Sequence, residues 1–216
     1  MSDLSGKAIG ESRVSWFVVV LAIILGLGAP VPIAVGGYIS LEWRPPTQTV
    51  SVGDPVNIAL YAVSSEPTSL RFSSLQAIFN WDPSRLMLLG RDDTGRPSLW
   101  MYGFLADPYG LNEAAVPADG DGLYVAIASL GHSVTVTSTG TLLTTFLFKA
   151  VAPASQTTLS IVPSGGSPTG ESFVTDEDGY RVTGGLGEAT VTILPEPATL
   201  GLLAASVVAW RRRRYG

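Results

Sequence analysis

The sequence predicts an all-β fold, a sandwich of two antiparallel sheets, from three observations. Short apolar segments alternate with polar residues at a period of two, as in residues 56–62, which is typical of half-buried strands. Turn-forming groups such as Gly53-Asp54-Pro55 and Asp121-Gly122 separate these segments. The central body shows no helical period, apart from one turn expected at residues 83–86. About ten short strands with frequent turns are typical of two packed antiparallel sheets.

The expected strands follow one another along the central body. Each repeats the short apolar alternation and ends near a turn signal. They span residues 40–43, 48–52, 56–62, 75–80, 86–89, 123–129, 141–150, 157–162, 172–175 and 188–194. Trp43 and Trp81 fall on strands or strand ends, so we expect both in the core. Residues 163–170, rich in glycine, serine and proline, are expected to form a loose connection.

The N-terminal residues predict a secretory signal. Residues 16–27 are an unbroken run of apolar or glycine residues, which matches the hydrophobic region of a signal peptide. The prolines that follow end any helix, and Ala34-Val35-Gly36 offers small residues to signal peptidase. We therefore expect residues 1–36 to be a signal helix read by the general secretion machinery and removed by signal peptidase. The alternative is an uncleaved membrane anchor over residues 16–35.

The C-terminal residues combine three features in a fixed order. Pro195, Glu196 and Pro197 come first, followed by an apolar segment at residues 198–210. As a helix this segment is about 20 Å long, shorter than the roughly 30 Å hydrocarbon core of a bilayer. The chain then closes on Arg211, Arg212, Arg213 and Arg214 and two further residues. Positive flanks of this kind are retained in the cytoplasm, so the motif is expected at the outer surface of the membrane.

This arrangement resembles the PEP-CTERM sorting signal of bacteria, which a membrane protease called exosortase recognises and cuts. The resemblance covers residues 195–216 and assigns the recognition motif to Pro195-Glu196-Pro197. It implies that the precursor inserts into the membrane and that the product reaches the cell surface or an extracellular polysaccharide matrix. The alternative is a plain tail anchor that is never cut.

The charge and composition of the body exclude several classes of function. The chain carries a formal charge of −5, but six of its basic residues lie near the two ends. Residues 37–194 keep fifteen acidic and seven basic side chains, about −8 in total, which argues against nucleic acid or anionic lipid as a partner of the body. Because cysteine is absent, the protein has no disulfide, thiolate nucleophile or thiolate metal site.

Several segments of the body, taken in order, resemble the cohesin-like branch of β-sandwich modules. In one of them, residues 78–89, an aromatic residue and Asp-Pro precede a leucine-rich strand. The matching segments are residues 76–89, 122–128, 140–150 and 157–161, and the Asp178-Gly179 turn before the last strand. The resemblance covers residues 41–193 and implies a non-enzymatic adhesion, scaffold or protein-binding module with a dockerin-like partner. Carbohydrate-binding jelly-roll modules share these patterns, so an exopolysaccharide ligand stays open.

The connection at residues 91–120 is the candidate ligand-binding segment. It carries Trp100, Tyr102, Phe104 and Tyr109 among prolines and glycines. Aromatic side chains in a polar loop suit sugar stacking or a protein contact, since both use large rigid faces. The alternative is that Trp100, Phe104 and Leu105 fold back and cap one end of the core.

Acidic pairs are the remaining candidate sites. Asp176 with Asp178, or Asp119 with Asp121, supply oxygen ligands suited to calcium, although aspartate is also common in turns. No other cofactor is expected. Paired carboxylates also leave a sugar hydrolase open as a third alternative. The single histidine, His132, has no partner that would make a catalytic site, so it is expected at the surface and the protein is expected not to be an enzyme.

Overall fold

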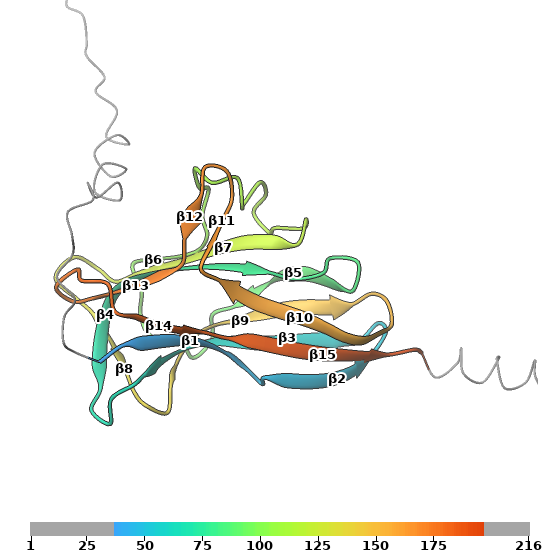
Figure 1. Cartoon of the computed structure of the whole chain (residues 1–216), viewed down its shortest axis with the longest axis horizontal. Coiled ribbons are helices and arrows are strands. Elements are labelled where there is room, and N and C mark those ends of the chain that lie inside the picture. The colour runs from blue at the N-terminus through green and yellow to red at the C-terminus, as the bar shows by residue number, and fades with distance from the viewer. Residues whose placement is uncertain (1–36, 197–216) are drawn as a thin grey trace, which may run out of the picture. The chain divides into compact units, whose positions relative to one another are not determined.

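The alternating segments pair into two sheets that pack face to face (Figure 1). The computed structural model describes residues 37–196, so the expected signal helix, the apolar segment at 198–210 and the terminal arginines lie outside the described residues. In this part of the chain, one sheet has five strands. Their order across the sheet is β14 (Thr183–Leu186), β1 (Ile39–Arg44), β3 (Pro55–Ser64), β9 (Thr141–Ala150) and β5 (Leu86–Asp92).

The second sheet has eight strands within residues 37–196. Six follow one another in the order β2 (Thr47–Ser51), β15 (Glu188–Leu194), β10 (Ala154–Val162), β4 (Leu70–Asn80), β7 (Asp121–Ile127) and β6 (Met101–Phe104). The other two, β8 (Val134–Val136) and β13 (Phe173–Asp176), pair with the first half of the long strand β4. A separate two-stranded hairpin consists of β11 (Ser164–Gly165) and β12 (Gly170–Glu171).

The predicted all-β sandwich is confirmed, but the prediction of purely antiparallel sheets is wrong. β1 pairs with β14 in parallel, and β2 pairs with β15 in parallel. The reason is that the first and last strands of the body run side by side and both cross from one sheet to the other. The first crosses at Pro45-Pro46 and the last at Gly187, whose amide donates to the Leu41 carbonyl oxygen at 2.8 Å. A Cβ atom at Gly187 would lie 2.9 Å from that oxygen, so glycine permits the crossing.

All ten expected strands are present, with shifted ends, and so is the expected turn, where the Leu86 amide donates to the Asp82 carbonyl oxygen. Five short strands were missed: β6, β8, β11, β12 and β14. The β14 sequence, Thr-Gly-Gly-Leu, lacks apolar alternation and is a strand because it pairs with β1. Residues 91–120 are therefore not a continuous loop, since they contain β6. No helix in residues 37–196 is long and apolar enough to cross a membrane.

The main core lies between the two sheets and is rich in aromatic residues. Phe79 of β4 is fully buried and its ring contacts those of Trp43, Trp81, Phe104 and Phe146, with centroids 4.8–6.2 Å apart. Aromatic pairs at such distances each add about 0.5–1.5 kcal/mol beyond the area that they bury. Trp43 and Trp81 are 2% and 6% exposed, which confirms that both belong to the core.

Candidate functional site

Pro195 and Glu196 follow the last strand of the body without an intervening loop. β15 lies between β10 and β2, and β2 pairs with it up to the register position Ser51–Leu194. The Val52 amide donates to the Leu194 carbonyl oxygen at 2.9 Å. Pro195 and Glu196 are exposed, and Pro197 lies outside the described residues. The predicted sorting motif therefore begins one residue after the last paired residue of the sheet.

The four candidate aromatic residues do not form one surface. Trp100 is 65% exposed just before β6, and its amide donates to the Ile127 carbonyl oxygen. Phe104 packs on the main core, so folding back is confirmed for Phe104 and wrong for Trp100. Tyr102 is half-buried against the core, while Tyr109 packs on a second cluster elsewhere. A ligand-contact role for these residues stays a prediction, and Trp100 alone of the four is exposed.

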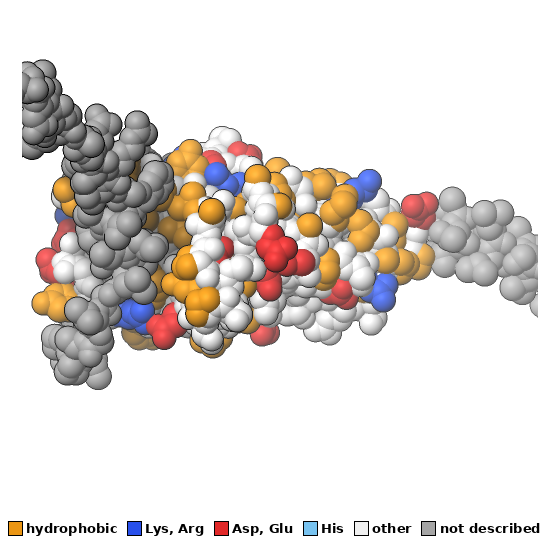
Figure 2. Space-filling view, turned by 90° about the horizontal axis from the view of Figure 1, so that it is seen from above, with side chains coloured by type: hydrophobic (Ala, Val, Ile, Leu, Met, Phe, Trp, Pro, Cys, Tyr) orange, Lys and Arg blue, Asp and Glu red, His pale blue; other side chains and the backbone are white. Residues whose placement is uncertain are grey.

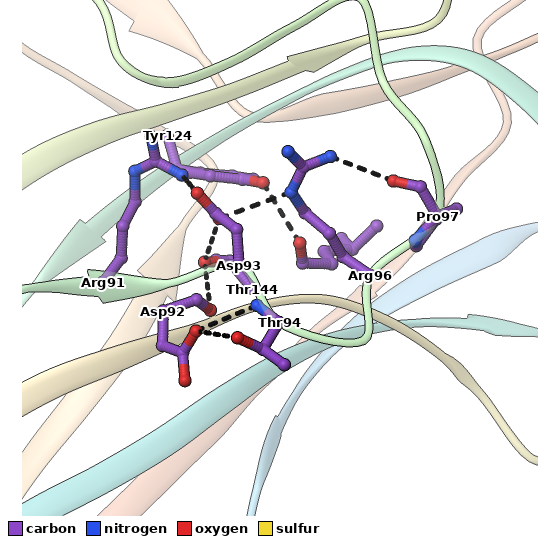
Figure 3. Close-up of polar contacts among 9 residues, drawn as sticks. Arg91, Asp92, Asp93, Thr94, Arg96, Pro97, Tyr124 and Thr144 are labelled. Atoms are coloured by element: carbon purple, nitrogen blue, oxygen red, sulfur yellow. Dashed lines mark hydrogen bonds and ion pairs between the residues drawn. The ribbon is translucent and has the colours of Figure 1, made fainter.

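Tyr102 lies beneath a half-buried group of charged residues, Arg91, Asp93 and Arg96. Figure 3 shows how these three charged residues lie together. The Arg96 guanidinium is 3.4 Å from the centroid of the Tyr102 ring, and that of Arg91 is 4.8 Å from it. Asp93 pairs with Arg91, lies 3.6 Å from Arg96 Nε, and accepts a hydrogen bond of 2.9 Å from the buried Thr144 hydroxyl. The Asp93 carboxylate and the face of the Tyr102 ring thus balance the positive charges of the two guanidinium groups. The guanidinium groups cover the Tyr102 ring, so this face is not presented for stacking on a ligand.

This charged group joins the edges of the two sheets. Arg91 belongs to β5, at one edge of the five-stranded sheet, whereas Tyr102 belongs to β6, at the edge of the other. Gly103 has a φ of +128°, and a Cβ atom there would lie 2.8 Å from Arg91 Nη2, so the close approach needs glycine. Near the charged group, burial raises the pKa of the Tyr124 hydroxyl, and the Asp93 carboxylate raises this pKa further. The group is a structural clamp that the sequence analysis missed.

A second small core lies on the outer face of the eight-stranded sheet. Ile78 and Leu123 alternate with inward-facing neighbours, so they point away from the main core, and they pack with Leu111. Residues 105–112 together with β11 and β12, here called the flap, cover this cluster. The Asp107 carboxylate accepts hydrogen bonds from the Tyr109 and Asn112 amides at 2.7 and 3.0 Å, which fixes the bend of the first part of the flap.

Asn112 attaches the flap to the sheet. Its side-chain amide donates to the carbonyl oxygens of Leu105 and Leu123 at 2.8 and 2.7 Å, and its Oδ1 accepts from the Leu123 amide at 2.9 Å. Residues 163–170 are not a loose connection, because they form most of a hairpin that packs on Tyr109. A Cβ atom at Gly170 would lie 2.8 Å from the Tyr109 ring, which explains a glycine at this contact.

Acidic side chains gather beside the flap, and Figure 2 shows a group of them near the middle of the face seen from above. Partial burial raises the pKa of Asp121, and the nearby carboxylates of Asp119, Asp107 and Glu113 raise it further. Asp121 Oδ1 is buried without a hydrogen-bond partner among the described residues. The carboxylates of Asp119 and Asp121, which the sequence analysis paired, are thus near enough to repel each other. Calcium there stays a prediction, because the described residues contain no group of three metal ligands.

The other acidic pair lies in the turn between β13 and β14. Asp176 Oδ1 accepts hydrogen bonds from the Asp178 and Tyr180 amides at 3.0 and 2.8 Å, which is the ordinary turn role of aspartate. Both residues line an open depression of about 250 Å³, where Arg71 pairs with Glu177 at 3.1 Å. His132 is exposed in the loop after β7, as expected.

The outer faces of the two sheets differ: the flap packs on that of the eight-stranded sheet, whereas β5 exposes apolar side chains on that of the five-stranded sheet. The five-stranded sheet exposes Met87 and Leu89 of β5, at 43% and 53%, and they alternate with the buried Leu86 and Leu88. Elsewhere on this sheet the Arg44 guanidinium lies 4.6 Å from the centroid of the Tyr61 ring. This outer face therefore exposes scattered apolar side chains at its β5 edge.

Comparison with known proteins identifies the fold of the described body. No family model matches the sequence, and no curated protein is similar to it. Solved structures are similar: a cohesin module from a family 33 glycoside hydrolase of Clostridium perfringens has a TM-score of 0.51 and 13% identity, over 74% of this chain and all of the module. A type I cohesin–dockerin complex from Clostridium thermocellum gives a TM-score of 0.51 and 10% identity, over 78% of this chain and 99% of the matched chain.

The described body has a cohesin-like fold. At such low identity the likeness establishes the architecture, and it confirms the fold that the segment patterns implied.

Proposed function

We propose that this protein is an exported, non-enzymatic binding or scaffold module that is displayed at a bacterial surface or in its polysaccharide matrix after processing at Pro195-Glu196-Pro197. The observation that carries the proposal is the junction at the end of β15. A folded cohesin-like body ends at Leu194, and the motif, an apolar segment and four arginines follow it. This order matches a folded cargo that precedes its own sorting signal.

Each part of the C-terminus then has a role in the proposal. Pro195, Glu196 and Pro197 form the motif that an exosortase-type membrane protease reads. Residues 198–210 dwell in the membrane, and Arg211 to Arg214 hold the end in the cytoplasm. Signal peptidase and the secretion machinery deliver the body, which carries no thiol that an oxidising compartment could alter.

The partner of the body in this proposal is a protein segment of the dockerin class. Support comes from the cohesin-like fold and from Met87 and Leu89, the apolar side chains that β5 exposes. Of the acidic pairs, Asp176 serves the turn between β13 and β14, since it accepts hydrogen bonds from the Asp178 and Tyr180 amides, and this argues for a structural role.

Intact mass of the protein recovered from its native host tests the sorting role. We expect the wild type to end near Pro197 and Glu196→Ala to keep Trp210 and the arginines. Glu113→Ala removes an exposed glutamate far along the chain from the motif and should be processed as the wild type is. A wild-type protein that retains its full tail would overturn the sorting proposal and leave a membrane-tethered module.

Polysaccharide binding is the second candidate function, and the exposure of Trp100 favours it. An exposed tryptophan offers a large flat face for stacking on sugar rings. Affinity electrophoresis in gels that contain exopolysaccharide from the host checks this, with Trp100→Ala expected to abolish retardation. Tyr180→Ala, which removes another exposed aromatic residue, is the matched control. Equal mobility of all three proteins with and without polysaccharide would count against this function.

A further inference from the structure

The last residues of β15 are held on both edges. On one side β10 pairs with it, with Ala154 opposite Ile193. On the other side β2 pairs with it in parallel, with Val50 opposite Ile193 and Ser51 opposite Leu194. Val191 and Ile193 are also anchored in the main core, at 0% and 2% exposure. The backbone just before the motif is therefore already paired inside a sheet.

The motif itself offers little backbone for a protease to bind. Extended peptides commonly bind by adding a strand to the partner, which uses their backbone N–H and C=O groups. Pro195 and Pro197 have no N–H, so Glu196 carries the only amide proton within the motif. Further backbone donors upstream of the motif must come from residues 192–194, the same residues that β2 and β10 engage.

β2 is the weaker of the two neighbours. It has five residues, none of them fully buried, and follows the double proline Pro45-Pro46. Parallel pairing is slightly weaker per residue than antiparallel pairing. Short, exposed elements open locally at a lower free energy than the whole domain. Separation of β2 from β15 is thus an opening that the folded body can undergo without unfolding.

We propose that β2 acts as a clasp on the processing site: while β2 is paired with β15, the protease cannot bind the end of β15, and it gains access only when β2 separates. The inference rests on the proposed sorting function and adds a regulation to it. The stability of the β2–β15 pairing sets the rate at which the folded precursor is cut. A precursor whose body is still unfolded lacks the clasp and is cut without this delay.

Pulse–chase processing of the full chain, in a host that contains the protease, tests the clasp. Insertion of Gly-Ser-Gly-Ser between Leu194 and Pro195 supplies free backbone outside the sheet, and we expect cleavage to be about tenfold faster or more. The same insertion after Gly179, in an exposed turn with no neighbour near its Cβ position, is the matched control and should leave the rate unchanged.

Val50→Ala tests the same idea from within the body. It removes methyl groups that pack against the core from β2, and we expect β2 to open more often and cleavage to be about fivefold faster. Hydrogen exchange at the Val52 amide, which donates to Leu194, reports that opening directly. Faster exchange at Val52 without faster cleavage would refute the clasp.

The outcomes separate the two proposals. If the wild type is cut, Glu196→Ala is not, and the spacer leaves the rate unchanged, the sorting function stands and the clasp is overturned. If neither the wild type nor the spacer variant is cut at the motif, the sorting function fails and the clasp fails with it. Cleavage of the spacer variant alone would be the extreme form of the expected result.

Discussion

The main core and the flap cluster are built from the same kinds of side chain but are held in different ways. The main core buries rings and aliphatic side chains from both sheets, and Phe79 alone contacts four other aromatic rings. The flap cluster buries three residues, Ile78, Leu111 and Leu123, beneath a loop and a hairpin. Its position depends on the hydrogen bonds of Asp107 and Asn112.

The two clusters should therefore differ in how much they contribute to the free energy of unfolding and in how readily they open locally. Apolar burial contributes about 25 cal/mol per Å², so the large core between the sheets dominates the free energy of unfolding. A cluster of three residues adds little, and it opens at a lower free energy than the whole fold. Changes in the core should therefore affect the whole molecule, whereas changes in the flap should alter one outer face of the eight-stranded sheet.

The largest effect is expected for Phe79→Ala, which breaks the core. The substitution leaves a cavity at the centre of the aromatic cluster and should lower the free energy of unfolding by about 3–5 kcal/mol. Urea unfolding followed by tryptophan fluorescence measures it, because Trp43 and Trp81 both contact Phe79. Tyr180→Ala, at an exposed position, should change stability by less than about 0.5 kcal/mol. Similar losses in the two variants would contradict the central place of Phe79.

A smaller and local effect is expected for Asn112→Ala, which detaches the flap. Three hydrogen bonds are lost and the Leu123 backbone groups lose their partner, a cost of about 1–3 kcal/mol. Hydrogen exchange should become faster at Leu123, and limited proteolysis faster within residues 105–120, while the Phe146 amide stays protected. Asn57→Ala, at an exposed position on β3, is the control. Uniformly faster exchange would show that flap and core open together.

A pH-dependent effect on stability is expected for Asp121→Asn, at the start of β7 and beside the flap residue Asp107. The raised pKa of Asp121 means that the folded protein binds this proton more tightly than the unfolded chain does. Its contribution to stability is therefore lost as the pH rises from the ordinary value of 3.8 through the raised pKa. The variant should be more stable than the wild type at pH 7 and should lose this advantage at pH 3. Thermal unfolding at both values checks this, and a lower melting temperature at pH 7 would contradict it.

The smallest effect on stability is expected for Trp100→Ala, which touches neither cluster. Its side chain is 65% exposed, so the free energy of unfolding should change by less than about 0.5 kcal/mol. The same urea titration measures it against Phe104→Ala, whose ring packs on Phe79 and Phe146 and which should lose considerably more stability. Equal losses would mean that Trp100 belongs to the core in solution.

The main core could be predicted from the sequence, and the flap could not. Strands such as β3 have strict alternation over ten residues, so their burial follows from the pattern. β14 and β6 are short and contain glycine, and only pairing with a distant strand makes them strands. The role of Asn112 depends on contact with Leu123, eleven residues away, and carries no local signal. The parallel pairs were missed for the same reason, because they join the two ends of the body.

The two crossing strands also determine how the body bears load. Ile39 begins β1 at one end of the sandwich and Leu194 ends β15 at the other, as Figure 1 shows. A pull that draws these ends apart acts along the strands, so the parallel ladders β1–β14 and β2–β15 are sheared and their hydrogen bonds resist together. A sideways pull on Glu196 instead breaks the β2–β15 bonds one at a time, beginning at Val52. The described body should thus resist a pull along its strands more strongly than a pull across them.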